Sequence, residues 1–362
     1  MTTTPSRRIA VALTAATSLL ALAACGASDS GSGSDETINI VGFAVPEAAN
    51  KAIADAFNET PEGENVEFRT SYGASGDQSR AVVDGLEADY VHLSVATDVD
   101  RLVDADLVED TWDDGENKGI VSTSIVVLGV REGNPKNIRG WEDLVEPGVE
   151  IVTANPASSG AARWNALAAW GSVTSAGGSE AEATDYIEKL FANVVSLTNS
   201  GRDATQSFLG GTGDVLLAYE NEAILAAQNG EGFDYVIPDT TLLIENPGAL
   251  LTEHTPAAEP WLDFVLSADG QREFALKGFR PLNLEEPGVA DLESVGLEAS
   301  DIEGAPDSSD PFPTVQNLLT LTDDFGGPGW DGVKDKLFGD GKDGAPVGIV
   351  TDAIAKSGKA TQ

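Results

Sequence analysis

The feature of this chain that most restricts its fold is a regular alternation of short runs rich in β-branched residues with stretches of helical periodicity. Because strands that alternate with helices build βαβ units, the pattern predicts an α/β fold with mainly parallel sheets covered by helices on both faces. In such sheets, ligands bind beyond the carboxyl ends of the strands. The predicted strands span residues 38–43, 66–71, 90–95, 124–130, 150–154, 194–198, 214–219 and 235–237, and the predicted helices include 46–57, 78–85, 161–170, 180–190 and 204–209.

Residues 1–24 have the pattern of an export signal. Arg7 and Arg8 form a short positive region, an almost wholly apolar stretch follows, and small residues precede Cys25. The Leu-Ala-Ala-Cys motif at 22–25 resembles the bacterial lipobox, in which the cysteine is lipidated and becomes the mature N-terminus. We therefore expect an exported lipoprotein, attached to the outer face of the cytoplasmic membrane through lipidated Cys25. An ordinary signal peptide with a chance cysteine is the alternative.

Residues 25–37 are rich in Gly, Ser and Asp and lack apolar periodicity, which predicts a flexible tether between the lipid and the folded body. Cys25 is the single cysteine, so once it carries lipid no disulfide, thiol nucleophile or cysteine metal site remains. The two histidines, His92 and His254, cannot form a zinc site without carboxylate ligands, and a structural role is expected for each. We expect no metal and no cofactor.

The formal net charge of −39 becomes −41 when Arg7 and Arg8 leave with the signal, since 21 − 2 = 19 basic residues then face 60 acidic ones. Such a surface argues against binding of nucleic acid or anionic lipid and suits solubility in a salty exterior. It does not exclude an anion site. Exposed charges are screened beyond about 8 Å at physiological salt, so the dipoles at the site itself decide what binds.

Four predicted strand-to-helix junctions share one design. They lie at residues 43–46, 72–76, 156–161 and 199–203, and each supplies backbone N–H groups at the positive end of a helix, with a glycine or small residue that lets an anion approach. Ser75 is the expected N-cap of the second helix. One such junction is usually only a cap, but four at the same end of the sheets indicate an anion site.

Several stretches resemble the sulfate- and thiosulfate-binding proteins of bacterial ABC importers, from Ile38 to about Gly341. The matching motifs are GASGDQ at 73–78, GLEAD at 85–89, REGNPK at 131–136, NPASSGAARWNALAAW at 155–170 and GDVLLAYENEA at 213–223. The resemblance implies a two-lobed periplasmic-binding-protein fold of type II and a function in sulfate capture. It also implies an importer permease as partner and a monomeric state.

In that family the anion is held in a dry cleft by neutral hydrogen-bond donors, without a paired cation. Carried over by position, the resemblance implies that the ligand-binding residues are Val45, Ser75, Ser159, Gly160, Ala161, Gly201 and Tyr219. Arg163 and Arg202 match arginines that stand behind the site without touching the ligand.

Donors alone would favour sulfate over phosphate. Sulfate at neutral pH only accepts hydrogen bonds, whereas phosphate carries a proton that needs an acceptor. Three positions depart from the family. Tyr219 stands where tryptophan is usual, Asp77 where lysine is common and Asp203 where glycine is common. If an aspartate faced the ligand, phosphate or arsenate would become credible; we expect both to be exposed first-turn residues that favour the helix dipole.

The resemblance further implies the lobe boundaries. Lobe I is expected to comprise residues 38–122 and 219–285, and lobe II residues 123–218, with closure over the anion about a hinge. The C-terminal segment 286–362 is left unassigned, with a crossing back to lobe II as one alternative and a flexible tail at its end. Trp164 and Trp170 are expected in the core, Asp98 as an ordinary N-cap, and Glu220 and Glu222 in contacts near the hinge.

Other classes of function fit the sequence less well. An enzyme would need a nucleophile elbow, a His–Cys pair or a metal-ligand cluster, and none is visible. An adhesive or scaffolding surface lipoprotein would not need four donor-rich junctions. Within solute binding, thiosulfate stays open as a second ligand because both subfamilies share these loops; molybdate, tungstate and phosphate are less favoured.

Overall fold

The computed structural model describes residues 36–325, 327, 329–342 and 345–359. The signal peptide, the expected lipidation site Cys25 and all but the last two residues of the tether lie outside this range.

Strands account for the centre of the body, and most begin within a few residues of their predicted positions. The strands are β1 (Thr37–Phe43), β2 (Glu67–Gly73), β3 (Tyr90–His92), β4 (Ile120–Val130), β5 (Ile151–Ala154), β6 (Val194–Thr198), β7 (Val215–Tyr219), β8 (Asp234–Val236), β9 (Thr240–Leu250) and β10 (Asn317–Leu319). In the described residues they form one hydrogen-bonded path in the order β2-β1-β3-β9-β4-β7-β5-β6, with β10 on β9 and β8 on β4.

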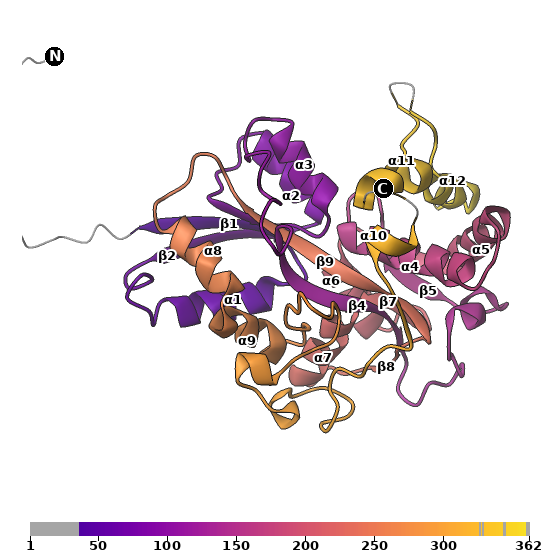
Figure 1. Cartoon of the computed structure of the whole chain (residues 1–362). Coiled ribbons are helices and arrows are strands. Elements are labelled where there is room, and N and C mark those ends of the chain that lie inside the picture. The colour runs from indigo at the N-terminus through magenta and orange to yellow at the C-terminus, as the bar shows by residue number, and fades with distance from the viewer. Residues whose placement is uncertain (1–35, 326, 328, 343–344, 360–362) are drawn as a thin grey trace, which may run out of the picture. The chain divides into compact units, whose positions relative to one another are not determined.

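Two long antiparallel strands, β4 and β9, join two groups of mainly parallel strands (Figure 1). Residues 248–250 of β9 pair with β3, which continues to β1 and β2 through parallel contacts. Residues 126–130 of β4 pair with β7, which continues to β5 and β6 through parallel contacts. This mixed, mainly parallel α/β architecture confirms the predicted fold class.

Helices cover the strands on both sides. They are α1 (Glu47–Phe57), α2 (Ser75–Val83), α3 (Ala96–Val103), α4 (Gly160–Ser175), α5 (Glu180–Asn193), α6 (Gly201–Leu209), α7 (Glu220–Gln228), α8 (Ala258–Leu266), α9 (Ala268–Leu276), α10 (Leu321–Asp324), α11 (Lys334–Phe338) and α12 (Ile349–Lys356). Figure 1 shows α2 and α3 on one side of the strands and α1, α8 and α9 on the other.

The sequence pattern missed β9, although this strand connects the two groups. Its segment Asn246-Pro247-Gly248 has the composition of a turn. In the structure this segment is where β9 leaves β4 and begins to pair with β3. A Cβ on Gly248 would lie 2.4 Å from the Tyr90 hydroxyl, so the crossing requires a residue without a side chain.

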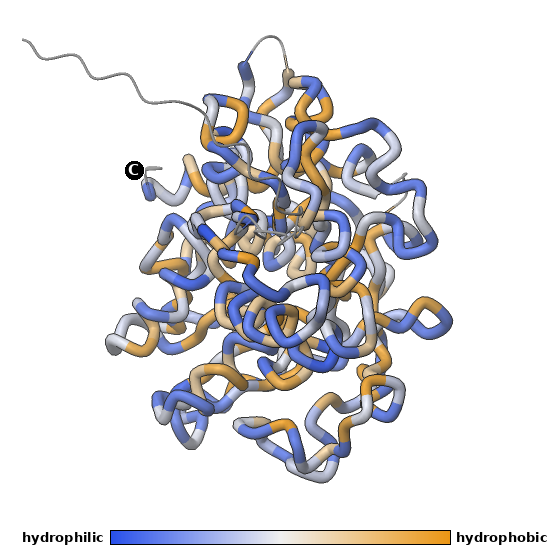
Figure 2. Tube along the Cα trace, turned by 90° about the vertical axis from the view of Figure 1, so that its left-hand side faces the viewer, coloured by the Kyte–Doolittle hydropathy of each residue, from blue (hydrophilic) through white to orange (hydrophobic). Residues whose placement is uncertain are grey.

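Apolar side chains from both strand groups fill the core, and apolar segments recur throughout the trace in Figure 2. Trp164 is fully buried and Trp170 nearly so, as expected of core residues. The Trp164 ring meets that of Trp330 at a centroid distance of 4.7 Å.

The C-terminal segment lies against α5, which belongs to the strand group of β5, β6 and β7. Lys356 of α12 pairs with Glu188 at 2.5 Å, and Lys336 of α11 pairs with Glu180 at 2.6 Å. We propose on this basis that the segment crosses back to lobe II, with the lobe boundaries kept as 38–122 and 219–285 for lobe I and 123–218 for lobe II.

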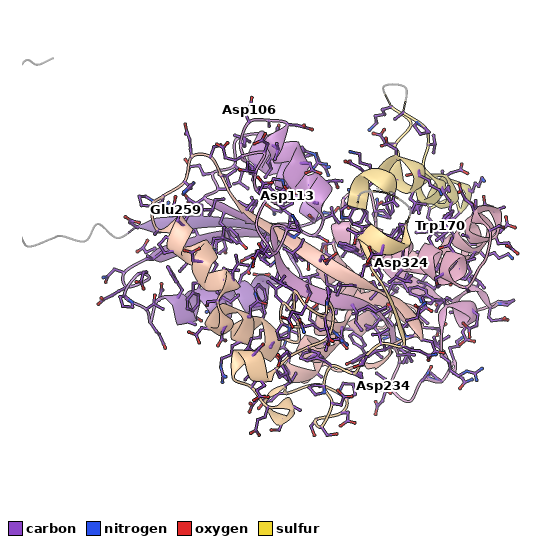
Figure 3. The ribbon with its side chains drawn as sticks, in the orientation of Figure 1. Asp106, Asp113, Trp170, Asp234, Glu259 and Asp324 are labelled. Carbon is purple, nitrogen blue, oxygen red and sulfur yellow. The ribbon has the colours of Figure 1, made fainter. Side chains whose placement is uncertain are left out.

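No helix in the described part of the chain combines the length and apolar character needed to cross a bilayer. Acidic side chains lie in separate regions of the body, as Asp106, Asp234 and Glu259 do in Figure 3.

Candidate functional site

The four predicted junctions meet at one place between the two strand groups. Gly201, the first residue of α6, is so close to its neighbours that an added Cβ would lie 3.0 Å from the Ala161 Cβ and 3.3 Å from a Val45 methyl carbon. An added Cβ on Gly160, the first residue of α4, would lie 2.6 Å from the Ser94 side chain. Gly76 of α2 donates a 2.9 Å hydrogen bond to the Ser158 carbonyl. Helices from both strand groups therefore converge.

Among the residues predicted to bind the ligand, five have a backbone N–H group with no hydrogen-bond acceptor within the residues that the structure describes. Except for Gly201, which is partly exposed, their residues are buried. They are the N–H groups of Val45, Ser75, Gly160, Ala161 and Gly201. Four of them belong to first turns of helices, where N–H groups have no intrahelical acceptor and carry positive partial charge. A buried N–H group without a partner is costly, so this set is suited to an acceptor supplied by a ligand.

The Ser159 side chain has a capping role here. Its hydroxyl oxygen accepts a 3.3 Å hydrogen bond from the Ala162 N–H, and its own N–H donates to the Asn155 carbonyl at 2.8 Å. Its hydroxyl hydrogen is still available to a ligand at the first turn of α4. Ser159 is 2% exposed, so only a group inside the cleft can reach it.

Ser75 is tied into a buried network. Its hydroxyl donates to the Asp98 carboxylate at 2.6 Å and accepts from the Ser94 N–H at 2.9 Å. Two cap predictions are wrong. Ala74 is the N-cap of α2 and Ser75 its first residue, while Val95 caps α3 and Asp98 is the third residue of that helix. The Asp98 side chain is 1% exposed, accepts a hydrogen bond from the Ser75 hydroxyl and pairs with Arg101. An ordinary cap would face the solvent instead.

Tyr219 lies at the end of β7 and is fully enclosed. Its hydroxyl lies 2.8 Å from the Ser94 hydroxyl and accepts a 3.3 Å hydrogen bond from the Asn246 side chain. Burial raises the pKa of Tyr219, so the phenol keeps its proton and can donate. Tyr219 therefore retains the donor capacity that the sequence comparison required of it.

Ser94 and Asn246 are site neighbours that the sequence did not reveal. The Ser94 carbonyl accepts from the Trp164 indole at 2.8 Å and from the Asn246 amide at 3.0 Å, which links β3, α4 and β9. Neither residue stands in a recognisable motif. Ser94 could have been suspected because it is the last residue but one of the predicted strand 90–95, but Asn246 lies in the strand that was missed.

The two arginines, Arg163 and Arg202, donate their hydrogen bonds to protein oxygens. Arg202 pairs with Glu222 at 2.7 Å and donates to the Val45 carbonyl at 3.0 Å. Arg163 donates to the Pro156 carbonyl at 3.0 Å and to the Thr97 hydroxyl at 3.2 Å. These contacts suit a supporting position behind the cleft, which stays a prediction.

Both questioned aspartates are engaged away from the five N–H groups. Asp77 pairs with Arg80 at 2.6 Å and accepts from the Asn199 amide at 2.9 Å, while Asp203 is exposed and accepts from the Ser200 hydroxyl at 2.8 Å. Each lies in the first turn of its helix, as expected.

His92 is fully buried between Asn50 and Ser122, at 3.1 Å from each, and burial lowers its pKa to about 3. It is therefore neutral and structural. In the described part of the chain, no group of three or more His, Cys, Asp or Glu side chains could hold a metal ion.

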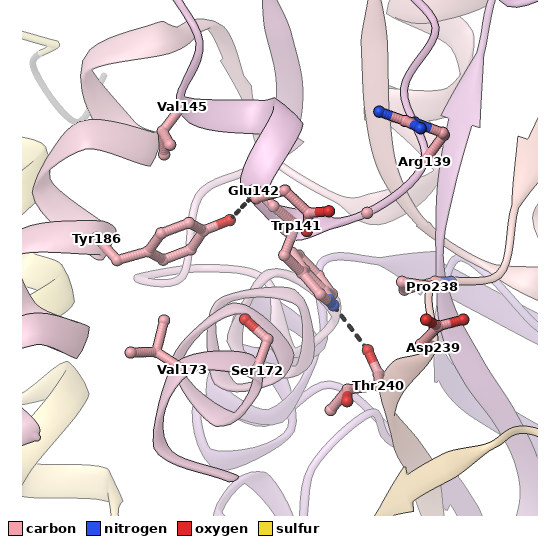
Figure 4. Close-up of a pocket in the computed structure, with 11 residues that line it drawn as sticks. Arg139, Trp141, Glu142, Val145, Ser172, Val173, Tyr186, Pro238, Asp239 and Thr240 are labelled. Atoms are coloured by element: carbon pink, nitrogen blue, oxygen red, sulfur yellow. Dashed lines mark hydrogen bonds between the residues drawn. The ribbon is translucent and has the colours of Figure 1, made fainter. Parts of the chain in front are cut away.

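A separate cavity of about 320 Å³ lies where α4 and α5 approach the start of β9, and it is lined by Trp141, Tyr186 and Thr240 (Figure 4). Its aromatic donors are already used. The Trp141 indole donates to the Thr240 carbonyl at 2.8 Å, and the Tyr186 hydroxyl donates to the Trp141 carbonyl at 2.5 Å. It includes none of the residues predicted to bind the ligand, and we do not assign the anion to it.

Comparison with known proteins agrees with the family resemblance found in the motifs. The family model described as bacterial extracellular solute-binding protein matches residues 38–280. The sulfate-binding protein of Synechococcus elongatus is 40% identical over 341 residues, which cover 90% of this chain and 92% of that protein. The thiosulfate-binding protein of Pseudomonas aeruginosa is 39% identical over 234 residues, which cover 62% of this chain and 70% of that protein. Among solved structures, the sulfate-binding protein SubI from Mycobacterium tuberculosis has a TM-score of 0.74 at 40% sequence identity. The match covers 84% of this chain and 99% of SubI.

Proposed function

This chain belongs to the family of bacterial extracellular solute-binding proteins, and we propose that it captures sulfate outside the cytoplasm and delivers it to an ABC importer. The proposed role is binding and release, with no catalytic step. Sulfate-binding relatives that match most of the chain support this choice of ligand.

The observation that carries the proposal is a set of N–H groups that lack an acceptor in the described part of the protein, those of Val45, Ser75, Gly160, Ala161 and Gly201. A ligand that offers several acceptor oxygens at once satisfies them, and a tetrahedral oxyanion does so from several directions. Helix N-termini contribute positive partial charge, so a full cation is not required beside the ligand. The hydroxyl groups of Ser159 and Tyr219 are proposed to add donors.

Selectivity for sulfate follows from the position of the carboxylates. The Asp77 and Asp203 carboxylates are hydrogen-bonded to other side chains, and neither is bonded to a residue of the donor set. Phosphate would bring a proton without an acceptor into a buried ring of donors, at a cost of several kcal/mol.

Thiosulfate is the second candidate, because a thiosulfate-binding relative is also 39% identical, although over a smaller part of the chain. Its terminal sulfur replaces one oxygen and is a weaker acceptor. We expect a donor set of this kind to bind sulfate more tightly.

The contacts between the strand groups support a closed arrangement. Trp164 donates to the Ser94 carbonyl, Arg202 to the Val45 carbonyl and Asn199 to the Asp77 carboxylate, and each contact joins helices or loops of different groups. We propose that closure about β4 and β9 traps the anion and that the closed monomer docks on a permease. We also propose that lipidated Cys25 holds the protein at the outer face of the cytoplasmic membrane.

A thermal-shift screen against sulfate, thiosulfate, molybdate, tungstate and phosphate tests the ligand class. A ligand present at 100 times its Kd adds about 2.7 kcal/mol to the free energy of unfolding, which gives a clear rise in Tm. The largest rise is expected with sulfate. No rise with any of the five anions would contradict oxyanion binding.

A further inference from the structure

A cavity of about 720 Å³ opens beside the candidate site and is enriched in basic residues. Five of its 18 lining residues are Lys or Arg, compared with 21 of 362 in the whole chain. They come from three regions: Arg80 and Arg101 from α2 and α3, Arg163 from α4, and Lys334 and Lys342 from the C-terminal segment. In a chain of net charge −39, this concentration of cations requires an explanation.

Four of the five cations have a carboxylate partner. Arg80 pairs with Asp77, Arg101 with Asp98, Lys334 with Asp331 and Lys342 with Asp340. Arg163 is the exception, since it forms no ion pair within the residues that the structure describes. It donates only to two neutral oxygens, the Pro156 carbonyl and the Thr97 hydroxyl. The Phe338 ring lies over its guanidinium at 5.9 Å.

The surroundings make this unpaired charge costly. Desolvation lowers the pKa of Arg163; the nearby Asp98 opposes the shift, while Arg101 and Arg80 add to it. Asp98 is already shared by the Arg101 guanidinium and the Ser75 hydroxyl. A largely buried cation without its own counter-charge is stabilised by an anion that enters the cavity.

The acidic residues of the cavity do not serve as that counter-charge. They are Asp100, Asp104, Asp335 and Asp340, and none forms an ion pair with Arg163. Burial and the neighbouring Asp331 raise the pKa of Asp100 to about 6. The Asp100 carboxylate therefore loses its charge in a mildly acidic medium.

We propose that this cavity is a second, outer site for a small divalent oxyanion, held by the Arg163 guanidinium and the Thr97 hydroxyl. The guanidinium offers a planar fork that matches two oxygens of one anion, and the Thr97 hydroxyl accepts from Arg163 while its own hydrogen can point to the ligand. Arg163 lies three residues after Gly160 on α4, so the outer site adjoins the donor set. The role of the outer site rests on the proposed function: it collects sulfate at the acidic surface before the donor set takes it up.

Calorimetric titration with sulfate in the Gly160→Ala background tests the outer site by itself. The added Cβ would clash with Ser94 and block the donor set, while the cavity is lined by other residues. We expect one weak, salt-sensitive site to remain in this variant and to vanish in Gly160→Ala/Arg163→Gln. The matched control is Gly160→Ala/Lys51→Gln, which should keep the weak site. Lys51 is an exposed lysine that pairs with Asp55 on α1, and α1 lies on the other side of the strands from α2 and α3 (Figure 1). Circular dichroism verifies that each variant is folded.

Stopped-flow kinetics in the wild-type background test the collecting role. Arg163→Gln should slow association at low ionic strength by at least about fivefold, with dissociation changed less than twofold, and Lys51→Gln should match the wild type. Absence of the weak site in the Gly160→Ala variant would overturn the proposal, as would a purely faster dissociation in Arg163→Gln. If the wild type binds no sulfate tightly but the weak site is still seen, the proposed function would be contradicted and the outer site would stand.

Discussion

The Ser75 hydroxyl donates a 2.6 Å hydrogen bond to the buried carboxylate of Asp98. A hydroxyl has one hydrogen, so in this arrangement the Ser75 side chain cannot also donate to an anion. The backbone N–H of Ser75 is the group that is left for the ligand. The side chain instead orders α2 against α3, since it also accepts from the Ser94 N–H.

Ser75→Ala should therefore affect folding more than binding. Loss of the hydroxyl leaves the Ser94 N–H and one Asp98 oxygen without their partner, and the free energy of unfolding should fall by about 1–3 kcal/mol. Sulfate affinity should change less than about threefold, because the interaction with the ligand is not removed. Urea unfolding and calorimetry measure the two effects.

Ser124→Ala is the matched control for Ser75→Ala, because the Ser124 hydroxyl is buried and has no hydrogen-bond partner among the described residues. Its removal should leave stability unchanged or slightly raised. A loss of affinity of a hundredfold in Ser75→Ala would show that the side chain does donate to the anion.

Tyr219→Phe should weaken sulfate binding. A hydrogen bond to a charged group contributes about 1.5–3 kcal/mol, which corresponds to a loss of about 10- to 150-fold in Kd. Tyr186→Phe removes a partly buried phenol hydroxyl that donates to the Trp141 carbonyl in the separate cavity, and it should bind sulfate as the wild type does. Equal affinities in the two variants would exclude Tyr219 as a donor.

Gly160→Ala should impair closure and binding together. The added Cβ would lie 2.6 Å from the Ser94 Cβ and Oγ, so the two strand groups must separate locally. Overpacking of this kind costs about 1–3 kcal/mol where the surroundings can relax; because this clash lies in the donor set itself, tight sulfate binding should be lost. Gly232→Ala, where the nearest contacts of the new Cβ are at 3.6 Å, is the control and should bind normally. Wild-type affinity in Gly160→Ala would refute this placement of α4.

The buried His92 should make the protein sensitive to acid. Its pKa of about 3 in the folded state lies below the ordinary value of 6.5, so the unfolded chain takes up a proton first as the pH falls. The stability contributed by the neutral ring is complete above pH 6.5 and is lost toward pH 3, at up to about 1.4 kcal/mol per pH unit. Between pH 6.5 and 5 the wild type should lose about 1.6 kcal/mol more than His92→Gln in urea unfolding, because the unfolded histidine is already half protonated at pH 6.5. If the free energy of unfolding of the wild type and of His92→Gln fell in parallel with pH, His92 would not titrate in this way.

Much of the fold and of the donor set could be predicted from the sequence, because both depend on local signals. β-branched runs indicated eight of the ten strands of the described body, and the strand-to-helix junctions, three of which contain Gly and Ser, indicated all four helix starts at the site. What could not be predicted depends on contacts between distant segments. β9 contains Pro247 and Gly248 where it changes partners, and Asp98 is buried only because α2 supplies Ser75.

The most direct test of the central claim is calorimetric titration of the ligand-free protein with sulfate and, separately, with phosphate at pH 7. If the site offers donors only, sulfate binds one tight equivalent and phosphate binds at least about a thousandfold more weakly, the ratio that a mismatch of about 4 kcal/mol produces. Phosphate binding comparable to that of sulfate would contradict the account, because it would require an acceptor that the ring of N–H groups does not contain.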